Sequence, residues 1–313
     1  MDRMRPKVSC HIITYNQKDY ISKCIDSVLM QERDFSIEIV IGDDNSSDGT
    51  REILLHYQKQ YPDLIRLNLR ERRGGGIPGK ENFLTTLTMC TGEYIALCDG
   101  DDYWSDPAKL RKQVAFLDTN PDYVLHSGNA IYLAENNPEA DGRKLHDESS
   151  DQTVYFEDFL SKNNLITCTV MFRNIPLQYP EIFMNLTFGD WFTYVMLLKE
   201  SGLRAYKSAQ VLSTYRLLQN SVMTSLSQAN YFKKHILQIK AIHQYTGRPL
   251  APKEKEKLND YYYSCFKVLM EEKKISTAIL SLADNIKTVR FSFPYRQYAG
   301  YLKLRLFSKS PLT

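Results

Sequence analysis

Long apolar runs are missing from this 313-residue sequence. No stretch of about 18 uninterrupted apolar residues occurs, so the sequence predicts no membrane-spanning helix. The first residues, MDRMRPK, lead into an apolar segment that is too short to form the core and cleavage site of a signal peptide. We therefore expect a cytoplasmic protein.

Metal-binding and disulfide patterns are also missing. The six cysteines lie far apart without a CxxC pair, and the six histidines form no ligand-spaced pair. This spacing argues against a zinc site or a disulfide framework and suits a reducing compartment. The net charge of +3, from 40 Lys and Arg against 37 Asp and Glu, is too small to indicate a nucleic-acid-binding protein.

Strand and helix patterns alternate through the first half of the chain. Apolar β-rich runs predict strands, and apolar residues at helical spacing or after capping residues predict helices. The predicted strands are 8–14, 37–41, 64–69 and 94–98, and the predicted helices are 20–29, the segment after 46–48, 80–90 and the segment that Pro107 opens. Four successive β-α units predict an α/β fold with a mostly parallel open sheet and helices on both faces.

The alternation weakens after about residue 122. Strands are predicted at 123–133, 165–172 and 211–217, a helix at 190–199 and a polar loop at 136–150. After Ser225 the pattern is helical. We therefore expect one domain over 1–225, with halves at 1–120 and 121–225, and a helical C-terminal region over 226–313.

The last 29 residues, 285–313, contain six basic side chains and no acidic one, with aromatic residues between them. A basic segment with interleaved aromatics is suited to lie flat on an anionic membrane surface. The same segment also suits a C-terminal helix that packs on its own domain. The sequence leaves both interpretations open.

Polar residues follow three of the predicted strands. Thr14-Tyr15-Asn16 follows the first strand, Asp43-Asp44-Asn45-Ser46 the second, and Asp99-Gly100-Asp101-Asp102 the fourth. Each cluster is also compatible with a solvated turn, because these are common turn residues. However, ligands of open parallel sheets bind beyond the carboxyl ends of the strands. Clustered carboxylates repel one another unless a cation lies between them, so 99–102 is a candidate platform for Mg²⁺ or Mn²⁺ and a diphosphate.

The glycine-rich segment 74–79 matches two phosphate-binding patterns imperfectly. It fits GxGxxG, but it follows the third predicted strand rather than the first. With Lys80 it approaches a P-loop, but Glu81 stands where a Ser or Thr hydroxyl is needed. We interpret the segment as a flexible glycine loop near a phosphate.

Four segments, in order, resemble the signatures of the family 2 glycosyltransferases. They are KVSCHIITYN at 7–16, SVLMQ at 27–31, IVIGDDNSSDGT at 39–50 and GEYIALCDGDDYW at 92–104. The resemblance is strong over 7–106 and extends more weakly to about 225. It implies a GT-A fold that binds a nucleotide-diphospho-sugar through a DxD-like motif and a divalent metal, and it says little about the sugar.

The resemblance also implies roles for residues of the first two clusters. Thr14, Tyr15 and Asn16 are expected to contact the nucleotide, largely through their backbone. Asp44 is expected to bond to the uracil edge, with Asp43 supporting it.

Two further acids receive roles from the resemblance. Asp99 is expected near the ribose or diphosphate, and Asp101, the second acid of Asp-Gly-Asp, is expected to ligate the metal. Asp190 begins a predicted helix at the place where the family has its catalytic base, although an acid there also serves as an N-cap. A base at this point implies attack by an acceptor hydroxyl with inversion of configuration.

The sequence departs from the family pattern in two places. Relatives often have a His two residues after the Arg that corresponds to Arg216, and this sequence has Leu218 there. Arg216 is expected near the diphosphate, with a structural salt bridge as the alternative. Where relatives often have Ala-Arg-Asn, this sequence has Lys80-Glu81-Asn82, and Lys80 is expected to supply the positive charge.

Together these features predict an inverting glycosyltransferase in cell-surface polysaccharide synthesis. It would move a sugar from a nucleotide donor, expected to be a UDP-sugar, to a glycan or lipid-linked acceptor at the cytoplasmic face of the membrane. One alternative is a sugar-phosphate nucleotidyltransferase, although 14–18 lacks the glycine-rich basic loop such an enzyme needs. Another is a catalytically degenerate protein that only binds sugar nucleotides, which Leu218 makes conceivable.

Overall fold

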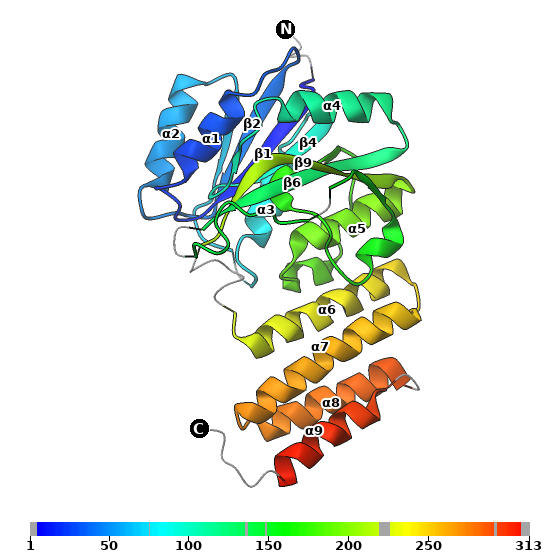
Figure 1. Cartoon of the computed structure of the whole chain (residues 1–313). Helices are drawn as coiled ribbons and strands as arrows, with labels where there is room; N and C mark the ends of the chain where they lie inside the picture. Colours follow the sequence, from blue (N-terminus) through cyan, green and yellow to red (C-terminus); the bar gives the residue numbers. More distant parts are fainter. Residues whose placement is uncertain are drawn as a thin grey trace. The chain divides into compact units, whose positions relative to one another are not determined.

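The computed structural model describes residues 5–74, 76–134, 137–147, 149–218, 226–290 and 293–307. The chain divides into two compact units, Met1–Gln219 and Asn220–Thr313, which we describe separately (Figure 1). None of the helices in these described ranges is long and apolar enough to cross a membrane. All six cysteines are buried free thiols, as their spacing predicts.

The first unit begins with a parallel half-sheet. Its strand order is β3-β2-β1-β4, and each neighbouring pair is parallel. The strands are β1 (Val8–Thr14), β2 (Ile37–Asp43), β3 (Ile65–Leu69) and β4 (Tyr94–Asp99), and the helices are α1 (Ile21–Leu29), α2 (Thr50–Gln60), α3 (Lys80–Thr88) and α4 (Lys109–Thr119). The predicted α/β class with a mostly parallel sheet flanked by helices is confirmed (Figure 1).

Both faces of this half-sheet are buried, which is why its strands read as nearly continuous apolar runs. On one face, Cys10 and Ile12 of β1 belong to the core that includes Ile25 of α1 and Leu110 of α4. On the other face, His11 lies with its ring 5.1 Å from that of Phe83 in α3. Because all four strands run the same way, their carboxyl ends share one edge of the sheet.

The second half of the sheet is mixed. The order continues β4-β8-β6-β9-β5, and β7 pairs with β9. Only β6 and β9 are parallel to each other; the other pairs in this half are antiparallel. The strands are β5 (Tyr103–Trp104), β6 (Tyr123–Leu133), β7 (Gln152–Val154), β8 (Met171–Arg173) and β9 (Arg204–Arg216). Helix α5 (Gly189–Ser201) follows the 3-10 helices η1 (Phe156–Phe159), η2 (Thr167–Thr169) and η3 (Glu181–Asn185).

Two predicted elements differ from the structure. The continuous strand predicted at 165–172 is wrong, because η2 interrupts it and only the short β8 follows. The Thr169 hydroxyl donates to the Ile166 carbonyl at 2.7 Å, a local bond that competes with strand pairing. Helix α4 begins at Lys109, two residues after Pro107, and is preceded by a turn in which an Asp106 carboxylate oxygen accepts the Ala108 N–H at 2.9 Å.

The second unit is helical, as the sequence predicts. Its helices are α6 (Gln228–Thr246), α7 (Pro252–Glu271), α8 (Ile275–Val289) and α9 (Tyr295–Phe307). Tyr298 of α9 is 3% exposed and belongs to the core of this unit with Phe266 of α7 and Ala278 of α8. Aromatic residues of the basic tail therefore pack inside the unit. Residues 308–313 and the side chains of 304–307 lie outside the described part.

Candidate functional site

The loops after β1 and β2 are tied together at the carboxyl edge of the sheet. The backbone N–H of Asp44 donates to the Thr14 carbonyl at 3.0 Å, and the N–H of Asn16 donates to Ser46 Oγ at 2.8 Å. Asn16 has φ 51°, a left-handed conformation that Asn tolerates, and its Oδ1 accepts the Ser47 N–H at 2.9 Å. The structure thus brings together the first two predicted clusters.

Asp43 is fully buried and accepts hydrogen bonds from Arg51 and Ser46. Its Oδ2 accepts two hydrogen bonds from the Arg51 guanidinium, at 2.9 and 2.6 Å, and the Ser46 N–H donates to the same carboxylate. The guanidinium also donates to the Arg70 carbonyl at 2.6 Å. Asp43 therefore fixes the backbone around the end of β2 and has little capacity left for a ligand.

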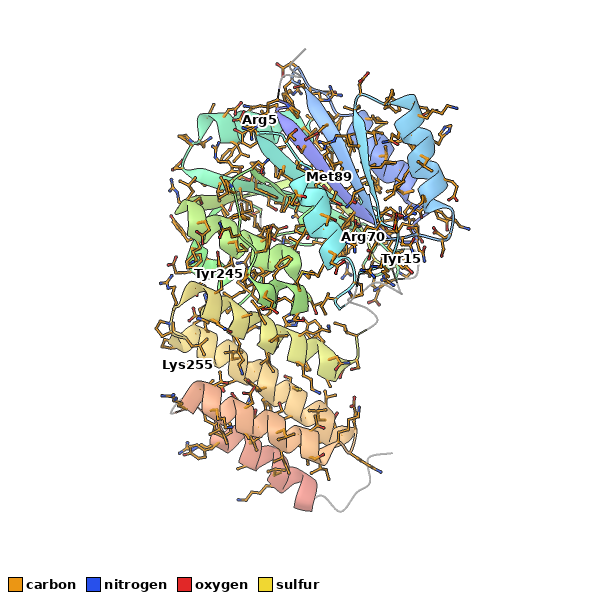
Figure 2. The ribbon with its side chains drawn as sticks, turned by 180° about the vertical axis from the view of Figure 1, so that it is seen from behind. Arg5, Tyr15, Arg70, Met89, Tyr245 and Lys255 are labelled. Carbon is orange, nitrogen blue, oxygen red and sulfur yellow. The ribbon has the colours of Figure 1, made fainter. Side chains whose placement is uncertain are left out.

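Asp44 differs because its carboxylate, only 1% exposed, accepts no hydrogen bond from the described residues. Two cations lie near it: Arg70 Nε is 3.2 Å from Oδ1, and Arg73 Nε is 3.6 Å from Oδ2. The Arg73 guanidinium stacks 3.8 Å from the centre of the Tyr15 ring. Figure 2 shows Tyr15 and Arg70 at this same end of the sheet. The arrangement provides two oriented acceptor oxygens beside an aromatic ring.

The acidic loop after β4 packs against the end of β1. A Cβ added to Gly100 would lie 2.5 Å from Gln17 Oε1 and 2.9 Å from Thr14 Oγ1, so only glycine fits there. Asp102 is 2% exposed, and its Oδ1 accepts the Arg216 N–H at 2.7 Å. Arg216 Nε in turn donates to the Asp101 carbonyl at 3.0 Å. The end of β9 is thereby attached to the acidic loop.

The negative charge of the carboxyl groups in this loop is disfavoured by burial and by mutual repulsion. Burial, with repulsion from Asp101 and Asp190, raises the pKa of Asp99 to about 7. Burial also raises the pKa of Asp101, although Arg216 opposes the shift. The pKa of Asp102 lies well above its usual range because of burial and the charges of Asp101 and Asp99. The site therefore favours an added cation.

Asp190 reaches this edge from the first turn of α5, far away in the sequence. Its Oδ2 accepts hydrogen bonds from Asn163 Nδ2 at 3.0 Å and from Thr167 Oγ1 at 2.9 Å. Sequence reasoning missed Asn163 and Thr167, because one lies in a loop and the other in the segment predicted as a strand. Their only sequence signal is polarity next to an apolar run, which is too common to single them out.

Lys80, the first residue of α3, lies beside Asp190. The side chain is 5% exposed, and its Nζ is 4.5 Å from the centre of the Phe183 ring. A Cβ on Gly189 would come within 2.0 Å of that Nζ, so the glycine makes room for the lysine. Burial lowers the pKa of Lys80 to about 8, while the Asp190 charge opposes this shift. A positive group thus lies next to the acid that begins α5.

No three His, Cys, Asp or Glu side chains within the described ranges converge as a complete set of metal ligands. Leu218, where relatives have His, follows β9, and residues 219–225 lie outside the described part.

The architecture and the clustered acids match a known family. Residues 9–177 fit the sequence model of glycosyl transferase family 2. The chain belongs to this family. The match confirms the resemblance carried by the four sequence segments.

Among individual relatives, an uncharacterized protein of Mycobacterium tuberculosis is 36% identical over 188 residues, or 58% of this chain and 51% of that protein. The chain thus spans about half the length of such curated relatives. The Escherichia coli UDP-Glc:alpha-D-GlcNAc-diphosphoundecaprenol beta-1,3-glucosyltransferase WfgD is 29% identical over 244 residues, or 78% of this chain and 88% of WfgD.

Solved structures of glycosyltransferases share the fold of this family 2 chain. S. aureus TarS in complex with UDP-GlcNAc superposes with a TM-score of 0.63 at 20% identity, over 94% of this chain and 83% of that one. Mannosyltransferase PcManGT from Pyrobaculum calidifontis, in complex with GDP-Man and Mn²⁺, superposes with a TM-score of 0.55 at 19% identity. This match covers 97% of this chain and 81% of that one. At these identities the likeness establishes the GT-A type of fold and no more.

Proposed function

We propose that the protein is an inverting glycosyltransferase that moves a sugar from a UDP-sugar to a glycan or lipid-linked acceptor in cell-surface polysaccharide synthesis. The observation that carries the proposal is the gathering of acids at one edge of the sheet. Asp99 interacts electrostatically with both Asp101 and Asp190, although Asp190 comes from the other half of the unit. Family membership supports transfer of a glycosyl group, and the name of WfgD supports a lipid-linked acceptor.

Asp44 suits the nucleobase because its two buried oxygens, although near Arg70 and Arg73, accept no hydrogen bond from any described residue. The N3–H of uracil is a donor of the right kind, and a charge-assisted hydrogen bond to a carboxylate is stronger than a neutral one. Tyr15, held under Arg73, offers a flat surface beside the same carboxylate. Asp43 supports this arrangement through Arg51 without touching the nucleotide itself. Thr14 and Asn16 contribute through their backbone.

The acidic loop suits a divalent cation and the donor's diphosphate. Its hard carboxylate oxygens and surplus negative charge fit Mg²⁺ or Mn²⁺. In this proposal Asp101 holds the ion and Asp99 lies near the ribose or diphosphate. The bound ion would supply neutralisation of charge on the leaving diphosphate. Arg216, anchored through the Asp101 carbonyl and Asp102, adds a fixed positive charge at the same place.

Asp190 suits the catalytic base because the hydrogen bonds it accepts from side chains in the described part of the chain reach only one of its oxygens. Asn163 and Thr167 fix Oδ2, which leaves Oδ1 to take the proton of an acceptor hydroxyl. As that proton leaves, the acceptor oxygen bonds to the anomeric carbon and the bond to the diphosphate oxygen breaks on the opposite face. The single displacement inverts the configuration. Lys80 keeps a positive charge beside the carboxylate during this step.

A panel of nucleotide-sugars, with Mg²⁺ or Mn²⁺, tests the proposal. We expect release of UDP from at least one UDP-sugar and a rise in melting temperature with UDP, because ligands of the folded state stabilise it by mass action. Asp101→Asn should lose the metal-dependent part of that rise. Asp34→Asn removes an exposed carboxylate just before β2, at the amino end of the strand, and should behave as wild type.

Two outcomes would overturn the proposal. The first is a folded protein that neither binds nor hydrolyses any nucleotide-sugar of the panel. The second is release of pyrophosphate from a nucleoside triphosphate and a sugar phosphate, which would identify a nucleotidyltransferase.

A further inference from the structure

Helix α8 presents an apolar face to the solvent. Ile275 is 54% exposed, Ile279 56%, Leu280 71% and Ile286 46%. At about 100° per residue these four positions fall within roughly 140° of arc, on one side of the helix. We call these four residues the α8 face. Exposed apolar residues that gather on one surface mark a site of interaction with another molecule or a membrane.

Another side of α8 faces the core through both apolar and polar contacts, because Ala278 and Val289 are buried there together with Asn285. Asn285 is fully buried, and its Nδ2 donates to the Tyr298 hydroxyl at 3.2 Å. Asp284 accepts hydrogen bonds from the Tyr262 hydroxyl and from Lys240 Nζ. Rotating α8 to bury its isoleucines would break these bonds. The helix is therefore fixed with Ala278, Asn285 and Val289 toward the core of the unit and with the α8 face toward the solvent.

The charge around the α8 face indicates what covers it. Lys287 and Arg290, at the C-terminal end of the helix, are exposed, and 285–313 contains no acidic residue. At the other end, Lys273 and Lys274 accompany Glu271 and Glu272, and Lys274 pairs with Glu272 at 2.7 Å. The excess of positive charge thus lies at the C-terminal end of the helix, where anionic lipid headgroups complement it.

We propose that the α8 face docks on an anionic membrane surface, with its isoleucine and leucine side chains at the level of the acyl-chain boundary. Lys287 and Arg290 then lie among the headgroups. Apolar area combined with basic residues is the pattern that binds helices in the plane of a membrane interface. The inference rests on the proposed function and deepens it, because docking of the α8 face would bring the enzyme close to a lipid-linked acceptor.

Vesicle flotation of the full-length protein tests this docking without any sugar nucleotide. Vesicles of phosphatidylcholine with phosphatidylglycerol should carry the protein, and vesicles of phosphatidylcholine alone should carry much less. The double variant Ile279→Ser, Leu280→Ser should lower the partition coefficient about tenfold or more, because its shortened side chains bury less hydrocarbon. Matched substitutions of exposed apolar residues in the first unit, Met30→Ser and Leu55→Ser, should leave it unchanged.

The charge contribution is tested in the same assay. Lys287→Gln should weaken binding about fivefold, since each basic residue near the surface contributes about this factor. Lys253→Gln, an exposed lysine in the first turn of α7, serves as its control and should bind as wild type.

The inference is overturned by equal flotation of wild type and the double variant. It is also overturned if the protein does not bind vesicles but forms a dimer in light scattering, and if the same double substitution abolishes this dimer. UDP-induced stabilisation, measured without vesicles, separates this failure from failure of the proposed function. We expect it to be identical in wild type and the α8 variants.

Discussion

Replacing Asp190 by Asn tests the catalytic base with little disturbance of the fold. Asn163 Nδ2 and Thr167 Oγ1 both reach Oδ2 of the aspartate, and the amide nitrogen of Asn163 can only donate. In the variant, the new amide oxygen therefore takes the place of Oδ2. The new NH₂ group then takes the place of Oδ1, where the proposed reaction needs a proton acceptor.

The expected loss follows from this geometry. General-base assistance contributes about 10²- to 10⁴-fold in rate, or about 3–5 kcal/mol of barrier, and an amide supplies none of it. Because both hydrogen bonds to the position persist, the melting temperature should change little. Asp190→Ala would leave both donors without a partner, at a cost of about 1–3 kcal/mol in the free energy of unfolding.

Steady-state rates with donor and acceptor, together with calorimetric titration of UDP, provide the assay. Asp190→Asn should lower kcat by the stated factor and leave the Kd for UDP unchanged. Glu181→Gln, which changes the exposed acid that begins η3, serves as the matched control. A kcat of Asp190→Asn within about threefold of wild type, with normal UDP binding, would show that another group takes the proton.

Three further predictions concern binding and stability. Asp44→Asn should raise the Kd for UDP about 10- to 100-fold in calorimetry, because it removes a charge-assisted bond from a buried acceptor; an unchanged Kd would remove Asp44 from the nucleobase site. Burial lowers the pKa of His11 to about 4 from 6.5, so the unfolded chain binds the proton more readily. The contribution of His11 to the free energy of unfolding is present above pH 6.5 and is lost as the pH falls toward 4, by up to about 1.4 kcal/mol per pH unit. In urea titrations at several pH values, His11→Leu should make the free energy of unfolding less dependent on pH in this range. Glu38→Gln should lower the free energy of unfolding by about 1–3 kcal/mol in the same titrations, because the carboxylate accepts bonds from Ser9 and from both the N–H and hydroxyl of Thr91. A change near zero would mean that the amide makes these contacts equally well.

The location of the candidate site at the carboxyl ends of the parallel strands could be predicted from the sequence, because the sheet topology determines where those ends lie. Strands β1, β2 and β4 are buried on both faces, so their apolar runs stand out and end abruptly in polar residues. Parallel pairing then brings those ends together, with Thr14 opposite Asp43 and Ile13 opposite Asp99. No detail of side-chain packing was needed for this part.

The surroundings of Asp190 could not be predicted in the same way. Asn163 and Thr167 act through hydrogen bonds to a residue more than twenty positions later, and the segment between them has no periodic pattern. The apolar run at 165–172 satisfies the requirements of a strand, and only local hydroxyl bonds such as that of Thr169 turn it into a 3-10 helix. The sequence suggests Lys80 as a source of positive charge, but its position beside Asp190 depends on the space that Gly189 leaves.

Helix α8 shows a different limit of pattern reasoning. Periodicity identifies an apolar side of a helix, and the usual expectation is that this side faces the core. Here only a narrow strip with Ala278, Asn285 and Val289 faces the core, and the hydrogen bond from Asn285 to Tyr298 helps to fix this orientation. An amphipathic pattern therefore identifies the apolar residues of a helix, and only the packing of the folded unit shows which of them are buried. In α8 the packing leaves the four residues of the α8 face exposed, so their apolar partner has to come from outside this unit.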